Sequence, residues 1–497
     1  MAKAIMIQGT MSNAGKSLIA AGLCRLFRQD GYRVAPFKSQ NMALNSFITP
    51  DGKEIGRAQA VQAEACGVQP DVRMNPILLK PTTDMGSQVV LMGEPVGNME
   101  AATYFRKKRE YIPLIREAYE SLAAENDIIV IEGAGSPAEI NLKKDDIVNM
   151  GMAKLADAPV LLVGDIDRGG VFAQLYGTVQ LLEEEERARI CGLVINKFRG
   201  DPGLLTSGLT MLENLTGKKV AGVVPWLDVC LEEEDSLGDS LREMTGSAGL
   251  MKQGLVDIAV IRLPRISNYT DFQALSLEQG VRVRYVTRLK ELSKPDAVIL
   301  PGSKSTMRDL EWLRQSGLEA AVLALHAEGV PVIGICGGYQ MMGERIDDPY
   351  EAEGGGSMEG MGILPVTTVF SPEKTMRRTE GRTADFGIPQ LAGQAVKGYE
   401  VHMGQTAESP AKCFAALESG PDGCGNGLAF GTYLHGVFDT EEFRGAFLNW
   451  LAGRSGVQLA GDRTDYRTFR EEQYDLLAAA LREHLDMRLV RQSMGLR

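Results

Sequence analysis

Residues 330–343, VPVIGICGGYQMMG, have the pattern of a buried strand, a sharp turn and the start of a helix. Gly334 and Gly338 flank Cys336 in a G-x-C-x-G pattern. A nucleophile on such a turn needs small neighbours, because the turn is tight and the side chain must stand clear of the sheet. The helix start supplies free N–H groups and a positive dipole end, which together favour a thiolate. The stretch therefore predicts an α/β domain in which Cys336 is a nucleophile, with a buried core cysteine as the alternative.

Two further stretches of the C-terminal half of the chain supply partners for the Cys336 thiol. The apolar residues 297–300 are followed by Pro-Gly-Ser, so an N–H near Gly302, together with that of Gly337, would form an oxyanion hole. His435 comes after a predicted strand and before a glycine, in a chain with only four histidines. We interpret His435 as the base that serves Cys336, although a packed or capping histidine would give the same local pattern.

The first residues of the chain predict a phosphate-binding loop. The strand AIMIQ (residues 4–8) runs into GTMSNAGKS (residues 9–17) and then into an apolar helix. Backbone N–H groups of such a loop surround phosphate oxygens, the lysine neutralises their charge, and the serine hydroxyl can bind Mg²⁺. Five residues, not the usual four, separate the two glycines, so the loop is a variant form. The candidate nucleotide-binding residues in it are Thr10, Gly15, Lys16 and Ser17.

Polar residues at the ends of other predicted strands extend this site. Glu132 ends the apolar strand DIIVI, where a carboxylate beside a phosphate loop can hold Mg²⁺ together with Ser17. Asn196 follows ICGLVI and could read an adenine edge with its amide. The candidate substrate-binding residues are Lys38, Asn41 and Asp146. A structural role for Glu132, as a cap or a salt-bridge partner, and a solvated loop around Lys38 are the alternatives.

The repeated alternation of apolar strands and helices predicts the fold class. Near-continuous apolar strands indicate parallel sheets that are covered on both faces, with ligands at their carboxyl ends. We expect two doubly wound, mostly parallel α/β domains joined by a linker. The predicted boundaries are 1–230 for the nucleotide-binding domain, 231–254 for the acidic linker, 255–450 for the cysteine-containing domain and 451–497 for a C-terminal helical segment.

Composition narrows the class of protein. With 497 residues and 44% hydrophobic residues, the chain can form two or three sizeable cores. A net charge of −12 argues against nucleic-acid and membrane-surface partners. The seven cysteines form no C-x-x-C pair, and no apolar run is long enough for a signal peptide or a membrane span. We therefore expect a cytoplasmic protein without a zinc site or a disulfide framework.

These motifs carry a resemblance to known enzymes. The order Pro-Gly-Ser, the Cys336 turn and His435-Gly resembles the class I glutamine amidotransferase domain, in a branch without the usual Pro-x-Glu after the histidine. The third member of the site is therefore open, and Glu400 is one candidate. The N-terminal half is similar to the dethiobiotin synthetase-like P-loop amidoligases through GTMSNAGKS, EGAGS and Asn196.

The combination resembles the cobyric acid synthase family of the cobalamin pathway, through IQGTMSNAGKS, FKSQNMALNS, EGAGSPAEINL and VGDIDRGGVFA. The resemblance implies ATP- and Mg²⁺-dependent amidation of the b, d, e and g carboxylates of adenosylcobyrinic a,c-diamide, with glutamine as the nitrogen source and an acyl phosphate as intermediate. Two alternatives remain open at this point. One is a cobyrinic acid a,c-diamide synthase, and the other is a MinD-like P-loop regulator with a degenerate amidotransferase module.

Overall fold

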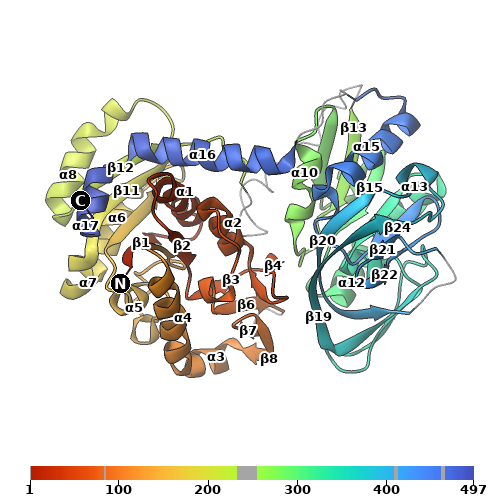
Figure 1. Cartoon of the computed structure of the whole chain (residues 1–497), viewed down its shortest axis with the longest axis horizontal. Helices are drawn as coiled ribbons and strands as arrows, with labels where there is room; N and C mark the ends of the chain where they lie inside the picture. Colours follow the sequence, from red (N-terminus) through yellow and green to blue (C-terminus); the bar gives the residue numbers. More distant parts are fainter. Residues whose placement is uncertain (1, 83–85, 232–254, 408–411, 460–464, 497) are drawn as a thin grey trace.

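A computed structural model describes residues 2–82, 86–231, 255–407, 412–459 and 465–496. In this part of the chain two separate parallel sheets form, one in each half of the molecule (Figure 1). The predicted fold class, two mostly parallel α/β domains, is confirmed. The linker predicted at 231–254 lies outside the described residues, apart from Leu231.

The N-terminal sheet is built from the apolar strands that the sequence predicts. Six strands are described in it, all parallel to their neighbours. In spatial order they are β12 (Val220–Pro225), β11 (Ile190–Phe198), β10 (Val160–Asp165), β1 (Lys3–Gly9), β9 (Ile128–Glu132) and β2 (Val34–Phe37). Because β1 and β9 are adjacent and parallel, the loops after them meet at the same edge of the sheet. This edge carries the predicted phosphate loop and Glu132.

Helices cover both faces of this sheet. The side chains of each strand alternate between two buried clusters, so that Ile5 and Ile7 face one and Ala4 and Met6 the other. The helices of this half are α1 (Lys16–Gln29), α2 (Arg57–Cys66), α3 (Ala101–Lys107), α4 (Ile112–Glu125), α5 (Met150–Leu155), α6 (Val171–Leu181), α7 (Glu184–Arg189) and α8 (Thr206–Thr216). A 3₁₀ turn, Lys108–Tyr111, separates α3 from α4, and Pro113 lies in the first turn of α4, where proline is tolerated.

Two small sheets stand beside the N-terminal sheet. One contains β3 (Gln40–Met42), β6 (Ile77–Pro81), β7 (Gly86–Leu91) and β8 (Glu94–Glu100). The other is a hairpin of β4 (Ser46–Ile48) and β5 (Glu54–Gly56). Figure 1 shows β4 at the edge of the N-terminal half that faces β19 (Thr367–Thr383) and β20 (Ala395–Thr406) of the other half.

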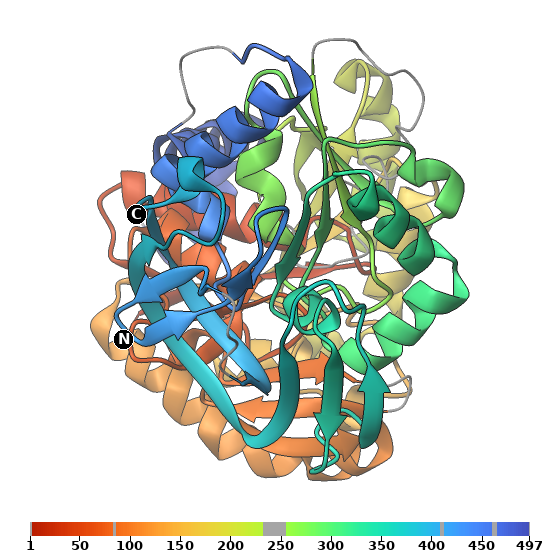
Figure 2. The ribbon, with the colours of Figure 1, turned by 90° about the vertical axis from the view of Figure 1, so that its right-hand side faces the viewer.

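The C-terminal half contains a parallel sheet and a second, largely antiparallel one. The first runs β14 (Val281–Val286), β13 (Val256–Ile261), β15 (Ala297–Leu300), β16 (Val332–Ile335) and β24 (Ala429–Thr432), with the short antiparallel β23 (Cys424–Gly425) at its edge. The second contains β17 (Arg345–Asp348), β18 (Gly356–Glu359), β19 (Thr367–Thr383), β20 (Ala395–Thr406), β21 (Ala415–Leu417) and β22 (Gly420–Asp422). In Figure 2 the long pair β19–β20, teal to light blue, lies beside the green strands of the parallel sheet.

The last helices return to the N-terminal half. The helices of the second half are α10 (Gln273–Ser276), α11 (Leu289–Leu292), α12 (Thr306–Gln315), α13 (Leu318–Ala327), α14 (Gly337–Met341), α15 (Glu441–Ser455), α16 (Tyr466–His484) and α17 (Met487–Ser493). Figure 1 shows α16 crossing from the C-terminal half to α1, and both chain ends lie on the N-terminal half. Leu477 and Leu481 of α16 are buried in the same cluster as Ile5 and Ile7. Helix α16 therefore joins the two halves through an apolar contact.

Candidate functional site

The phosphate loop lies between β1 and α1, as predicted. Gly15 precedes α1 with φ 99°, a left-handed conformation that a glycine adopts without strain. The buried Lys16 extends back over the loop, and its Nζ donates to the carbonyls of Met11 (3.1 Å) and Gly135 (3.3 Å). The loop opens into a cavity of about 760 Å³ that Gly15, Lys16 and Ser17 line. The arrangement fits the phosphate chain of a nucleotide.

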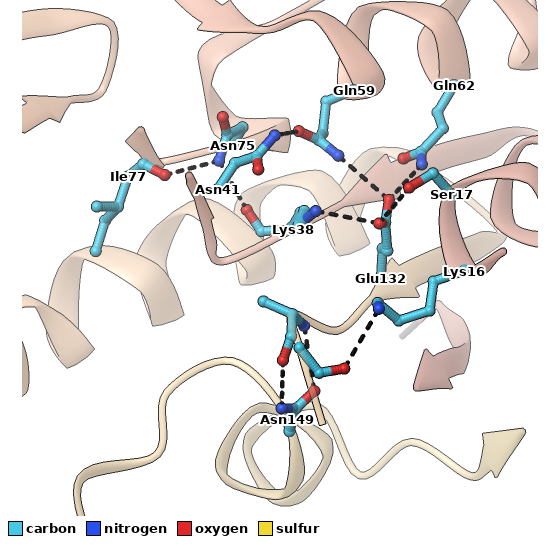
Figure 3. A network of polar contacts seen from close by, with 12 residues as sticks. Lys16, Ser17, Lys38, Asn41, Gln59, Gln62, Asn75, Ile77, Glu132 and Asn149 are labelled. Carbon is cyan, nitrogen blue, oxygen red and sulfur yellow. Dashed lines mark hydrogen bonds and ion pairs between the residues drawn. The ribbon is translucent and has the colours of Figure 1, made fainter. Parts of the chain in front are cut away.

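Glu132 is the centre of a buried polar network (Figure 3). Its Oε1 accepts hydrogen bonds from Ser17 Oγ (2.7 Å) and Lys38 Nζ (3.1 Å), and its Oε2 accepts one from Gln62 Nε2 (2.6 Å) and a longer one from Gln59 Nε2 (3.4 Å). Burial would raise the pKa of Glu132, but Lys38, Ser17 and Gln62 lower it below its usual value. The carboxylate therefore stays ionised beside the phosphate loop.

The predicted nucleotide residues Asn196 and Thr10 have different positions. Asn196 Nδ2 donates to the carbonyl of Ala14 in the phosphate loop (2.9 Å), and the Asn196 side chain lines the cavity. A Cβ on Gly15 would lie 2.0 Å from Asn196 Nδ2, so only glycine allows this contact. Thr10 Oγ1 instead donates to Gln174 Oε1 (3.1 Å), and Thr10 is not among the described residues that line the cavity.

The three predicted substrate residues, Lys38, Asn41 and Asp146, all line this cavity. All three are already engaged in other contacts, and that of Lys38 is its ion pair with Glu132. Asn41 Nδ2 donates to Gln59 Oε1 (2.8 Å), which joins Asn41 to the Glu132 network. The Asp146 carboxylate accepts backbone N–H groups at 2.8–2.9 Å, from Val148, Asn149 and Gly151. Asp146 therefore shapes the loop before α5, whatever else it contacts.

Cys336 stands on a strained turn at the end of β16. Its φ of 49° lies in the left-handed region, which is unusual for a residue with a side chain. A Cβ on Gly334 would lie 2.6 Å from Tyr339 Cα, and one on Gly338 would lie 1.9 Å from the Leu300 carbonyl. Both glycines are therefore required by the packing of the turn, as the G-x-C-x-G pattern predicts.

His435 is buried beside this turn, and its partner is an aspartate. Nδ1 of His435 lies 2.7 Å from Asp271 Oδ2, and the N–H of Gly436 donates to Asp271 Oδ1 (3.1 Å). Burial would lower the pKa of His435, but the charge and hydrogen bond of Asp271, with a hydrogen bond to Cys336, raise it to about 10. Cys336, His435 and Asp271 thus form a connected set of the kind that activates a thiol.

The sequence interpretation missed Asp271 and suggested Glu400, which is wrong for this role. Glu400 forms an ion pair with Arg377 and lies 4.0 Å from His402, on β20. Asp271 is in the loop after β13, 164 residues before His435, and no local motif marks it. The available signal in the sequence was the position of Asp271 shortly after the parallel strand β13. That strand lies next to β15, and the loop after β15 packs against Cys336.

The residues proposed for an oxyanion hole come together around Cys336. A Cβ on Gly337 would lie 2.8 Å from the Ser303 nitrogen, and one on Gly302 would lie 3.1 Å from His435 Cε1. Gly337 is the first residue of α14, where a helix leaves its N–H groups without an acceptor. The loop after β15 and the start of α14 therefore both lie against the Cys336–His435 pair.

The two sites define a class of protein: a glutamine amidotransferase domain joined to a P-loop nucleotide-binding domain. Residues 5–237 match the CobQ/CobB/MinD/ParA nucleotide binding domain, and residues 257–443 match the CobB/CobQ-like glutamine amidotransferase domain. None of the helices in the described part of the chain combines the length and apolarity that a membrane span needs.

Curated relatives match along nearly the whole chain. The cobyric acid synthase of Ruminiclostridium cellulolyticum is 55% identical over 99% of this chain and 96% of its own length. That of Lachnoclostridium phytofermentans is 54% identical over 99% of both chains. That of Salmonella typhimurium is 52% identical over 98% of this chain and 97% of its own. The chain belongs to the cobyric acid synthase family.

Proposed function

We propose that this protein makes cobyric acid by ATP- and glutamine-dependent amidation of the b, d, e and g carboxylates of adenosylcobyrinic a,c-diamide. The observation that carries the proposal is the presence, on one chain, of a Cys336–His435–Asp271 set and a P-loop cavity. Identity of 52–55% to cobyric acid synthases over both halves supports the same reaction.

The N-terminal half activates the substrate carboxylate. A carboxylate is a poor electrophile until one of its oxygens becomes part of a leaving group. Transfer of the γ-phosphoryl group of ATP to that oxygen releases ADP and gives an acyl phosphate. Lys16, held over the loop by two backbone carbonyls, offsets the charge that develops on the phosphates. Ammonia then attacks the acyl carbon, and phosphate leaves as the amide forms.

Mg²⁺ fits the residues at the phosphate loop. Ser17 and Glu132 offer a hydroxyl and an ionised carboxylate 2.7 Å apart, and both are oxygen ligands of the kind Mg²⁺ prefers. The described residues contain no cluster of three or more His, Cys, Asp and Glu side chains suited to a metal ion. Ser17 and Glu132 would therefore hold the ion together with phosphate oxygens, and the ion would neutralise phosphate charge.

The C-terminal half releases ammonia from glutamine. Cys336 Sγ attacks the side-chain amide carbon of glutamine, and N–H groups around Gly302 and Gly337 stabilise the oxyanion. His435 gives its proton to the departing nitrogen, which leaves as ammonia and a thioester remains. Water, deprotonated by His435, hydrolyses the thioester to glutamate. Asp271 holds the imidazole by its Nδ1 throughout.

The cavity next to the phosphate loop suits the corrinoid. Several apolar side chains line it, which fits the face of a macrocycle, while the polar lining residues Lys38 and Asn41 belong to the Glu132 network. The apolar lining residues include Leu79, Val89, Met99, Tyr104 and Phe105. We propose a cytoplasmic location, since all seven cysteines are free.

Counting amides tests the proposed reaction. The purified chain is incubated with ATP, Mg²⁺, glutamine and adenosylcobyrinic a,c-diamide, and the corrinoid is followed by mass spectrometry. We expect four successive losses of about 1 Da, one for each carboxylate converted to an amide. Cobyrinic acid is offered in a parallel reaction, and its amidation at two positions, with none on the a,c-diamide, would identify an a,c-diamide synthase. Glutamine hydrolysis without any amide would favour a regulator.

Replacement of Asp271 by asparagine should lower kcat for glutamine hydrolysis by about 10²-fold or more. An amide cannot supply the negative charge that holds His435 in its tautomer and stabilises its protonated form. Amidation with added ammonium should change by less than about threefold. Glu400→Gln is the matched control, because Glu400 pairs with Arg377 instead. Equal rates for the Asp271 and Glu400 variants would contradict the assignment. The measurement is glutamate release at saturating glutamine.

A further inference from the structure

The β4–β5 hairpin of the N-terminal half contacts the C-terminal half next to His435. The carbonyl of Ser46 accepts hydrogen bonds from Tyr399 Oη (3.2 Å) and from Asn268 Nδ2 (3.3 Å). Asn268 Nδ2 also donates to Tyr399 Oη at 2.7 Å. All three residues are buried, so this contact between the halves is shielded from bulk solvent. Figure 1 shows β4 beside β19 and β20.

The two residues that hold Ser46 also hold the catalytic pair. The ring of Tyr399 stacks on the imidazole of His435, with centroids 5.4 Å apart and planes at 22°. The backbones of Tyr399 and His435 exchange two hydrogen bonds, of 3.1 Å and 2.9 Å. The carbonyl of Asn268 accepts the N–H of Asp271 (3.0 Å), in a turn where Asn268 has φ 52°. Ser46 is therefore linked to His435 through Tyr399 and to Asp271 through Asn268.

Aromatic and charged contacts fix the hairpin in this place. The Phe47 ring meets Tyr399 edge-on, with centroids 5.4 Å apart. The guanidinium groups of Arg57 and Arg378, one from each half, lie 4.9 Å and 5.0 Å from the centroid of the same ring. Tyr399 is also buried in the same apolar cluster as the N-terminal sheet. The hairpin is thus docked by its own side chains.

A buried ion cluster adds to this docking. Glu54 of β5 binds Lys80 from its own half (2.6 Å) and Lys374 from the C-terminal half (2.5 Å). Lys80 Nζ also donates to Ser46 Oγ (3.0 Å). Breaking a buried pair of this kind leaves an uncompensated charge, so the cluster favours one relative position of the halves.

The other end of the hairpin leads directly to the nucleotide site. Helix α2 begins at Arg57, the residue after β5, and its Gln62 binds Glu132 Oε2 at 2.6 Å (Figure 3). Glu132 in turn accepts from Ser17 of the phosphate loop. One continuous segment, residues 46–62, therefore contacts Tyr399 and Asn268, which hold His435 and Asp271, at one end and the phosphate-loop carboxylate Glu132 at the other.

We propose that Tyr399 and Asn268 are positioning residues that make glutamine hydrolysis depend on the docked β4–β5 hairpin. The inference rests on the proposed function, because it makes the glutaminase site of that function depend on the half that holds the nucleotide site. Tyr399 and Asn268 orient His435 and Asp271 only while the Ser46 carbonyl is in place. Ammonia is then released chiefly when the N-terminal half is arranged to use it.

Tyr399→Phe and Asn268→Gly test the proposal. The first removes the hydroxyl and keeps the ring on His435, and the second removes the amide and tolerates φ 52°. We expect each to lower kcat for glutamine hydrolysis by about tenfold, with the glutamine KM within twofold of that of the unaltered chain. Ammonium-dependent amidation should stay within twofold. Tyr119→Phe is the control, because Tyr119 Oη donates to a backbone carbonyl inside the N-terminal half.

The outcomes separate this inference from the proposed function. Unchanged kcat in both variants would overturn the inference. So would an equal loss with glutamine and with ammonium, because the residues would then support the whole fold and not the catalytic pair. If the unaltered chain forms no amide from ammonium and ATP, the proposed function fails, but glutamate release from the same variants still decides the role of Tyr399 and Asn268.

Discussion

With alanine in place of Cys336, glutamine-dependent amidation should fall by at least about 10³-fold, whereas ammonium-dependent amidation should stay within about threefold. Alanine cannot attack the glutamine amide, so no thioester forms and no ammonia is released. A 10³-fold loss corresponds to about 4 kcal/mol of barrier. The phosphate-loop cavity and the Glu132 network lie in the other half and keep their contacts.

The experiment for Cys336 compares two nitrogen sources on the same corrinoid. Amide formation is measured with glutamine and with ammonium chloride at a pH where some ammonia is present. Cys413→Ala is the matched control, since Cys413 is a half-buried cysteine of the same half and lies outside the turn of Cys336. The control should keep both activities. Loss of the ammonium reaction in the Cys336 variant would mean that the two sites are not separable.

The parallel sheets could be predicted because their strands are local apolar runs. The runs 127–131, 158–164 and 190–195 are long enough and apolar enough to be buried strands, and the structure forms the interior strands β9, β10 and β11 there. The β4–β5 hairpin could not be predicted in the same way, since Ser46–Ile48 and Glu54–Gly56 are only three residues each. It is held by contacts with distant segments of both halves, such as Glu54 with Lys80 and Phe47 with Tyr399, and no local pattern encodes them.

The same difference between local patterns and long-range contacts explains which site residues could be predicted. Cys336, Lys16 and Ser17 stand in contiguous motifs, because a tight turn and a phosphate loop each impose residue types on their neighbours. Asp271 acts through a contact between distant segments, and any carboxylate at that sheet edge would fit the pattern. Asp146 shows the converse, since its position suggested a ligand and its carboxylate is engaged with three backbone N–H groups.

Replacing Lys16 by alanine should reduce amidation with either nitrogen source by at least about 10³-fold. Lys16 is the charged residue that lies within the phosphate loop, held by the carbonyls of Met11 and Gly135. Without it, the charge on the transferred phosphoryl group is no longer offset, and the acyl phosphate does not form. Glutamine hydrolysis by Cys336 should persist, because His435 and Asp271 keep their contact in the other half.

The Lys16 result is informative because it is the mirror image of the Cys336 result. One variant should lose both nitrogen sources and keep glutamate release, whereas the other should lose glutamine alone. Lys219→Ala serves as the control, since Lys219 is an exposed lysine of the same half that pairs with Glu213. Normal amide formation in the Lys16 variant would remove the phosphate loop from the reaction. The Lys16 variant keeps the docked β4–β5 hairpin but lacks the lysine that binds the nucleotide. Its residual glutamate release therefore shows how much of the activity at His435 depends on the hairpin and how much depends on the nucleotide.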